Sequence, residues 1–112
     1  MKVKELATLP NLILLNEIKE NAVIKNYYCG DLLSFIMGNA HKESTCLLTV
    51  MTSMNVIGVA VLLDFKAIIF TSNTNPSEEV IKKASDENIP LFKTPLDGLE
   101  IYEEILKYEG KI

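Results

Sequence analysis

The sequence predicts a single three-layer α/β domain with a largely parallel β-sheet. Two continuous apolar runs, residues 46–51 (CLLTVM) and 66–70 (KAIIF), have the length of strands and the composition of strands that are covered on both faces. The 14 residues between them suit the crossover of about a dozen or more residues that a parallel pair of strands requires. With 112 residues, the chain is long enough for one domain and too short for two.

The segment before the first of these strands is predicted to contain only short elements. Residues 3–8 predict one turn of helix, residues 11–15 (NLILL) a short strand, and residues 22–24 a weaker strand. Residues 31–37 predict a helix with Asp31 as its N-cap. The apolar side of that helix is formed by Leu32, Leu33, Ile36 and Met37.

Residues 55–63 (NVIGVAVLL) are predicted to form a buried helix. Their composition alone also suits a strand, but the crossover between two parallel strands favours a helix here. Gly58 and Ala60 would allow this helix to lie close to the sheet. The next helix has Asn75 as its predicted N-cap and Pro76 as its first residue, and it ends before Pro90.

The last part of the chain predicts a strand followed by a helix. Residues 91–93 (LFK) suit a short strand, and residues 94–97 (TPLD) repeat the helix-cap pattern, with Thr94 as the predicted N-cap. The final helix is expected to run to about Tyr108. Its inward side is predicted to carry Leu99, Tyr102, Ile105 and Leu106.

Composition and charge exclude several classes of protein. The net charge is −4, and no cluster of Lys or Arg is present, so nucleic-acid binding is not expected. The uncharged run of 17 residues, 47–63, is shorter than the roughly 20 residues of a membrane helix and is expected to be a core element. Hydrophobic residues make up 48% of the chain, a surplus that favours a buried partner surface.

The cysteines and the single histidine predict neither a metal site nor a catalytic centre. Cys29 and Cys46 lack CxxC spacing, and without a secretory signal they are expected to be reduced thiols of a cytoplasmic protein. Cys29, Asp31 and His41 are close in sequence, but the predicted helix would separate Cys29 from His41 by about 10 Å. Cys29 is expected to be a packed thiol, and no cofactor is expected.

Polar residues follow each predicted strand where a helix begins. Ligands of open α/β sheets bind outside the carboxyl ends of the strands, where helix N-termini favour anions. A small anionic or nucleotide-like ligand is one interpretation, and helix capping and turn formation is the other. No glycine-rich phosphate-binding fingerprint is present. The candidate ligand-binding residues are Thr52, Ser53, Asn55, Thr71, Ser72, Asn73, Lys93 and Thr94.

Three segments in the same order resemble DRTGG domains. Residues 28–34 (YCGDLLS), followed by Met37 and residues 39–40, resemble the central segment of that family. Residues 49–60 resemble its strand, loop and helix, with Asn55 at a characteristic position. AIIFT and the following NPSEEVIKKASDENIPLFKTP resemble its last helix and strand. The similarity covers residues 22–106, and the whole chain, residues 1–112, is expected to form a single domain of this kind.

The resemblance implies a fold similar to that of the N-terminal domain of HPr kinase/phosphorylase. DRTGG domains occur in phosphotransacetylases, beside CBS domains in regulated inorganic pyrophosphatases, and as standalone proteins, some of them encoded near iron hydrogenases. The resemblance implies a regulatory or ligand-sensing module that lies at dimer interfaces and has no established catalytic residues. The candidate dimer contacts are Tyr27, Tyr28, Gly30 and Asp31.

The chain departs from the DRTGG pattern at two positions. Lys25 and Asn26 stand near the place of the Gly-Gly pair, and Ser53 stands where relatives often carry His. The expected function is that of a non-enzymatic, dimeric regulatory module with a small anionic ligand. An accessory protein that docks onto a larger metabolic or redox enzyme, such as a hydrogenase, is the alternative, and a thiol-dependent enzyme centred on Cys29 is the weakest hypothesis.

Overall fold

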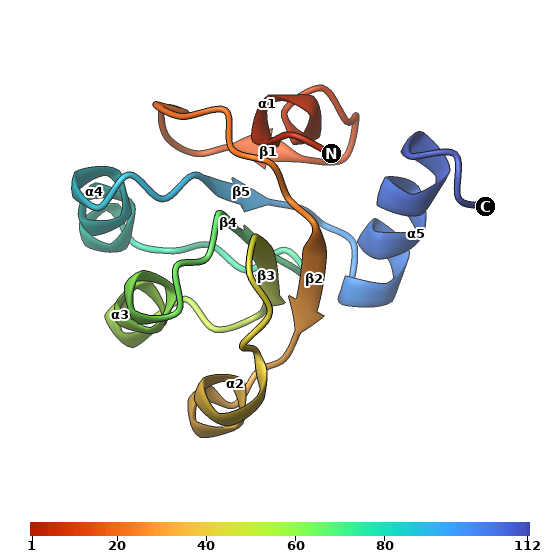
Figure 1. The fold of residues 1–112 in the computed structure, drawn as a ribbon. Coiled ribbons are helices and arrows are strands. Elements are labelled where there is room, and N and C mark those ends of the chain that lie inside the picture. The colour runs from red at the N-terminus through yellow and green to blue at the C-terminus, as the bar shows by residue number, and fades with distance from the viewer.

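A five-stranded sheet in the order β1-β5-β4-β3-β2 organises residues 1–112 in the computed structural model (Figure 1). Strands β2 to β5 are parallel to their neighbours, and β1 pairs with β5 in the antiparallel direction. This confirms the predicted α/β class. The elements are α1 (Val3–Leu6), β1 (Ile13–Leu14), β2 (Asn26–Cys29), α2 (Leu33–Asn39), β3 (Thr45–Thr49), α3 (Met54–Leu62), β4 (Ala67–Phe70), α4 (Glu78–Asp86), β5 (Leu91–Lys93) and α5 (Gly98–Tyr108).

Helices cover both faces of this sheet. Figure 1 shows α2, α3 and α4 on one face, and α1 and α5 on the other. Side chains alternate between the two faces along a strand. In β3, Leu47 therefore packs in the core under α3 and α4, whereas Cys46 and Leu48 pack in the core under α1 and α5. Every residue of β3 and β4 is buried, which explains their uninterrupted apolar composition.

Two helix caps predicted from the sequence, Asn75 and Thr94, were both placed too early in the chain. Asp97 caps α5, since its carboxylate accepts a hydrogen bond from Glu100 N at 2.9 Å, and Glu100 Oε1 accepts one from Asp97 N at 3.1 Å. The cap of α4 is Ser77 and not Asn75, because Ser77 Oγ accepts the bond from Val80 N at 3.3 Å. Pro76 therefore lies before the helix.

Four further predictions about the elements were wrong. Residues 26–29 form strand β2, which the sequence did not predict. The segment 22–24 makes only an isolated bridge between Val23 and Lys2. Asp31 does not cap α2, because that helix begins after Leu32 and has no side-chain cap. In α5 the buried residues are Ile101 and Ile105, and Leu99 points outward.

No helix of this fold combines the length and the apolar character that crossing a membrane would require. The uncharged run therefore corresponds to two packed elements, β3 and α3, and not to one span.

Candidate functional site

Five of the predicted ligand-binding residues lie together at the carboxyl ends of β4 and β5. The segment after β4 donates hydrogen bonds from Ser72 N to Leu96 O at 2.7 Å and from Asn73 N to Thr94 O at 2.9 Å. Ser72 and Asn73 have left-handed backbone conformations, with φ of 56° and 60°. Thr71 is buried, and Lys93 Nζ donates to the Asn75 side chain at 3.1 Å. The polar groups of this cluster are thus largely used to join the two loops to each other.

The other three predicted ligand-binding residues lie at the start of α3, after the neighbouring strand β3. Ser53 is the N-cap of α3, but its side chain makes no capping hydrogen bond, and the side chains of Thr52 and Asn55 are also without a hydrogen-bonded partner in the chain. Helix N-termini carry free N–H groups and the positive end of the dipole. Of the eight residues, Asn55 alone lines a cavity, the groove between α2 and α3.

An acidic side chain already occupies the end of β3. Asp31 Oδ1 accepts hydrogen bonds from Thr49 Oγ1 at 3.0 Å and from Val50 N at 2.9 Å. The carboxylate thus takes the backbone donor that directly follows β3. Of the predicted dimer contacts, Asp31 and Gly30 therefore have roles within the chain, and Gly30 N donates to Leu48 O at 3.1 Å.

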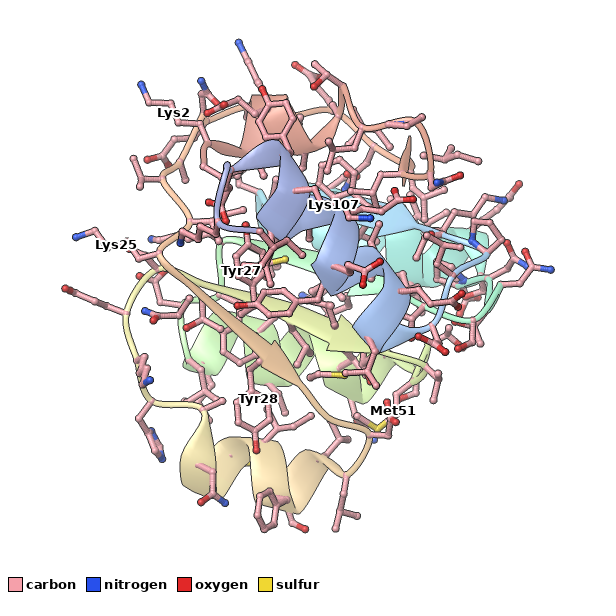
Figure 2. The ribbon with its side chains drawn as sticks, turned by 90° about the vertical axis from the view of Figure 1, so that its right-hand side faces the viewer. Lys2, Lys25, Tyr27, Tyr28, Met51 and Lys107 are labelled. Carbon is pink, nitrogen blue, oxygen red and sulfur yellow. The ribbon has the colours of Figure 1, made fainter.

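Strand β2 forms one edge of the sheet, and its outer side has no partner strand. Asn26 N donates to Ser44 O and Gly30 N to Leu48 O, so these residues direct their backbone groups toward β3. Because the direction alternates along a strand, Tyr27 and Cys29 direct their N–H and C=O groups outward. Figure 2 faces this side of the molecule and shows β2 between α5 and α2, with Tyr27 toward α5 and Tyr28 toward α2.

Exposed apolar side chains border this free strand on both sides. Leu99 and Tyr102 of α5 lie on one side, with exposures of 83% and 37%, and Leu32 and Phe35 lie at the start of α2 on the other. We call these four residues, together with Tyr27 and Cys29, the β2 edge surface. A cavity of about 170 Å³ opens within it, lined by Tyr27, Cys29, Leu48, Gly98, Leu99 and Tyr102.

The side chains of the β2 edge surface are mainly apolar. The rings of Tyr27 and Tyr102 pack at a tilt with their centroids 5.4 Å apart. Partial burial, followed by the negative charges of Asp31 and Asp97, raises the pKa of the Cys29 thiol. Cys29 was predicted to be a packed thiol, but it is exposed, while Cys46 is buried in the core. No group of three or more His, Cys, Asp or Glu side chains is placed to hold a metal ion.

One family model matches the chain. It describes the HPr Serine kinase N terminus and covers residues 53–108, which is half of the sequence. The chain belongs to this family. Since DRTGG domains are of this type, the match confirms the resemblance seen in the sequence. No curated protein matches the chain.

The match to the HPr Serine kinase N terminus family begins at the N-cap of α3 and ends with α5. It therefore covers α3, β4, α4, β5 and α5 and includes most of the strand-end residues. Strand β2 and helix α2 lie outside the matched range. The family match therefore describes only part of the residues around the free edge.

Sequence reasoning identified part of the β2 edge surface and missed the rest. Tyr27 and Tyr28 were predicted to be dimer contacts. The sequence placed them in the segment before a helix, whereas they belong to the edge strand β2. Leu99 was predicted to face the core. Ile101 and Ile105 form one possible apolar face of this helix, but Leu99, Tyr102 and Leu106 form another, so the spacing alone did not separate the two.

Proposed function

We propose that this protein is a non-enzymatic regulatory module that acts as a homodimer through the β2 edge surface. One observation carries the proposal. A strand with outward-directed backbone groups lies open between two borders of exposed apolar side chains. An open edge of this kind is a template for pairing with another chain. The surplus of apolar residues in the sequence supports the same conclusion.

The chemistry of the surface supports binding and not catalysis. A nucleophilic cysteine requires a lowered thiol pKa and a neighbouring base. Cys29 has a raised pKa, and the acidic residues nearest to it, Asp31 and Asp97, oppose its ionisation. Both carboxylates are also engaged in hydrogen bonds that stabilise the fold.

Sedimentation velocity at micromolar concentration tests the dimer. We expect the wild type to sediment as a dimer and the Leu99→Lys variant as a folded monomer with an unchanged circular dichroism spectrum, because Leu99 is exposed in the single chain. The matched control is Leu62→Lys, which places the same charge at an exposed leucine of α3, 66% accessible and outside the β2 edge surface. A monomeric wild type, or equal loss of the dimer in both variants, would contradict the proposal.

We further propose that the N-terminus of α3 binds a small anion. The unpaired side chains of Thr52, Ser53 and Asn55 beside free helix N–H groups support this part. A thermal-shift screen with nucleotides and acyl phosphates tests it, since a ligand at 100 times its Kd stabilises a protein by about 2.7 kcal/mol. The shift should be lost in Ser53→Ala and retained in Ser72→Ala. If no compound shifts the melting temperature of the wild type, the anion-binding proposal is wrong, and the dimer proposal is unaffected.

An accessory protein that docks onto a larger enzyme is the second candidate. It is favoured by the apolar groove between α2 and α3, which has a volume of about 530 Å³ and is lined by Leu33, Met37, Met54 and Leu62 among others. Exposed methionines suit adaptable binding surfaces. A metabolic or redox enzyme that co-purifies with the wild type and with Leu99→Lys, but not with Leu62→Lys, would support docking at this groove. Recovery of the free homodimer alone would argue against it.

A further inference from the structure

We propose that two copies join their β2 strands in antiparallel pairing, with Tyr28 on the two-fold axis, so that two five-stranded sheets become one continuous sheet. This inference rests on the proposed homodimer and specifies its geometry. A two-fold axis at right angles to the sheet brings the same edge of both copies together, and the paired strands then run in opposite directions. A second copy of this chain suits the free edge, because Lys25 and Asp31 flank Tyr28 symmetrically and are complementary to themselves across such an axis.

The backbone limits the possible registers. Hydrogen bonds between antiparallel strands form only where outward-directed residues face each other. In β2 these residues are Tyr27 and Cys29, because Asn26 and Gly30 donate their N–H groups to the β3 side. Lys25 cannot extend the free edge, since Lys25 N also donates to Ser44 O, at 2.8 Å. The strands can therefore be centred on Tyr27, Tyr28 or Cys29.

Centring on Tyr28 makes the largest number of backbone bonds. Tyr27 then faces the partner's Cys29, and Cys29 faces the partner's Tyr27, so that two bonded pairs form. Centring on Tyr27 or on Cys29 leaves one bonded pair, in which the central residue faces its own copy. Since each bonded pair contributes two hydrogen bonds, the Tyr28 register satisfies all the outward groups of the strand.

The charges at the ends of β2 select the same register. Lys25 precedes Tyr28 by three residues and Asp31 follows it by three, and both residues are exposed. Within the chain Asp31 accepts hydrogen bonds through Oδ1, which leaves Oδ2 for the partner's lysine. Only centring on Tyr28 brings Lys25 next to the partner's Asp31, and symmetry repeats this pair at the other end. Figure 2 shows Lys25 at the start of β2, with its side chain extending away from the body of the molecule. Opposite charges on facing strands stabilise their pairing.

The apolar borders are also brought together by this axis. Both copies of α5 lie on one face of the joined sheet, and both copies of α2 lie on the other. Leu99 follows Gly98, where an added Cβ atom would lie 2.7 Å from Cys29 Sγ, so Leu99 begins close to the axis. The cavity beside Cys29 and Tyr102 thus offers an apolar site to the partner's Leu99.

Disulfide trapping tests the register. Across the axis, the two Cα atoms at position 28 would be about 4.5 Å apart, as in an antiparallel pair without hydrogen bonds, and a disulfide spans this distance. The two Cys29 Cα atoms would be roughly 8 Å apart, beyond that range. We expect Tyr28→Cys in a Cys29→Ser background to form a covalent dimer under mild oxidation, and the wild type, with Cys29 alone at this edge, to form none.

Charge reversal gives a second measurement that does not depend on the packing of Tyr28. Lys25→Glu should raise the dimer Kd roughly tenfold, because it removes two opposite-charge pairs and creates two like-charge pairs. The control Lys82→Glu makes the same change on α4, at an exposed lysine without an ion pair, and should alter Kd less than twofold. Equal effects of the two reversals would overturn the register.

The two proposals fail in different ways. A wild type that is monomeric at micromolar concentration overturns both the homodimer and its register. If the wild type is trapped as a covalent dimer through Cys29, while the Tyr28→Cys variant in the Cys29→Ser background is not trapped, the homodimer stands and the register is overturned.

Discussion

Asp31 Oδ1 accepts a hydrogen bond from Thr49 Oγ1 at 3.0 Å, which ties the loop after β2 to the end of the neighbouring strand β3. The same carboxylate oxygen accepts a bond from Val50 N at 2.9 Å, and Thr49 Oγ1 in turn accepts one from Met51 N at 3.1 Å. The three bonds form a connected network that fixes both strand ends. The edge strand β2 is thereby held to the sheet at its carboxyl end.

Replacing Asp31 should destabilise the fold. We expect Asp31→Ala to lower the free energy of unfolding by about 1–3 kcal/mol, because it removes a charged acceptor from two donors, of which Thr49 is buried. Asp31→Asn retains one acceptor oxygen and should cost less. Urea denaturation measures both. The control Glu20→Ala removes an exposed carboxylate without a hydrogen bond; a loss equal to that of Asp31→Ala would contradict the prediction.

The central strands of the sheet could be predicted from the sequence, because burial on both faces of a strand produces a continuous apolar run. The runs that contain β3 and β4 are apolar throughout, and the requirement for a crossover between them correctly predicted α3. Strand β2 carried no such signal. It has four residues, lies at an edge, and is followed directly by a Gly-Asp pair that suggested the cap of a helix. Pairing with β3 makes it a strand, and that contact is not local in sequence.

One part of the candidate site could be predicted from the sequence, and the other part could not. Residues after β4 and β5 meet because the carboxyl ends of parallel strands share one side of the sheet. The β2 edge surface could not be predicted without β2. The face of α5 was ambiguous because Leu99 and Ile101 both belong to plausible apolar stripes, and only docking on the sheet selects Ile101 and Ile105.

The contact between Cys29 and Gly98 predicts a coupled pair of substitutions. A Cβ atom at Gly98 would lie 2.7 Å from Cys29 Sγ, and outside its chain neighbours and the backbone of its own helix it would meet no other atom within 4 Å. Gly98→Ala should therefore destabilise the protein by about 1 kcal/mol or more. In a Cys29→Ala background the same change should be neutral or stabilising, since alanine is the better helix former.

A double-mutant cycle with urea denaturation measures this coupling. Gly58→Ala is the matched control, because an added Cβ atom at Gly58 would meet nothing within 4 Å. It should stabilise α3 with or without Cys29. Additive effects of Gly98→Ala and Cys29→Ala would show that the sulfur atom does not limit the space at residue 98.

Removing the hydroxyl group of Tyr27 should stabilise the protein. The Tyr27 hydroxyl oxygen is buried and has no hydrogen-bond partner, and burial raises the pKa of the phenol above its ordinary value. Tyr27→Phe keeps the ring that packs against Tyr102 and should raise the free energy of unfolding by up to about 1 kcal/mol. Tyr28→Phe is the control and should change it by less than about 0.5 kcal/mol. A clear loss of stability in Tyr27→Phe would contradict the prediction.

The buried thiol of Cys46 predicts a loss of stability at alkaline pH. Burial raises the pKa of Cys46 above its ordinary value of 9.0 in the folded protein, whereas the unfolded chain ionises near that value. The unfolded state therefore releases its proton first, and the free energy of unfolding should fall as the pH rises above about 9. Tyr27, whose pKa is also raised, should add to the fall above its ordinary value of 10.0.

Urea denaturation between about pH 7.5 and 10.5 tests this dependence, since the range brackets the ordinary pKa of a thiol. Cys46→Ala should lower stability at neutral pH, because it removes the sulfur atom from the core. It should also flatten the alkaline fall, so that its difference from the wild type becomes smaller as the pH rises. Native-state alkylation gives an independent readout, since the exposed Cys29 should react while Cys46 reacts only after unfolding. An alkaline profile equally steep in Cys46→Ala and the wild type would show that ionisation of Cys46 does not drive the fall.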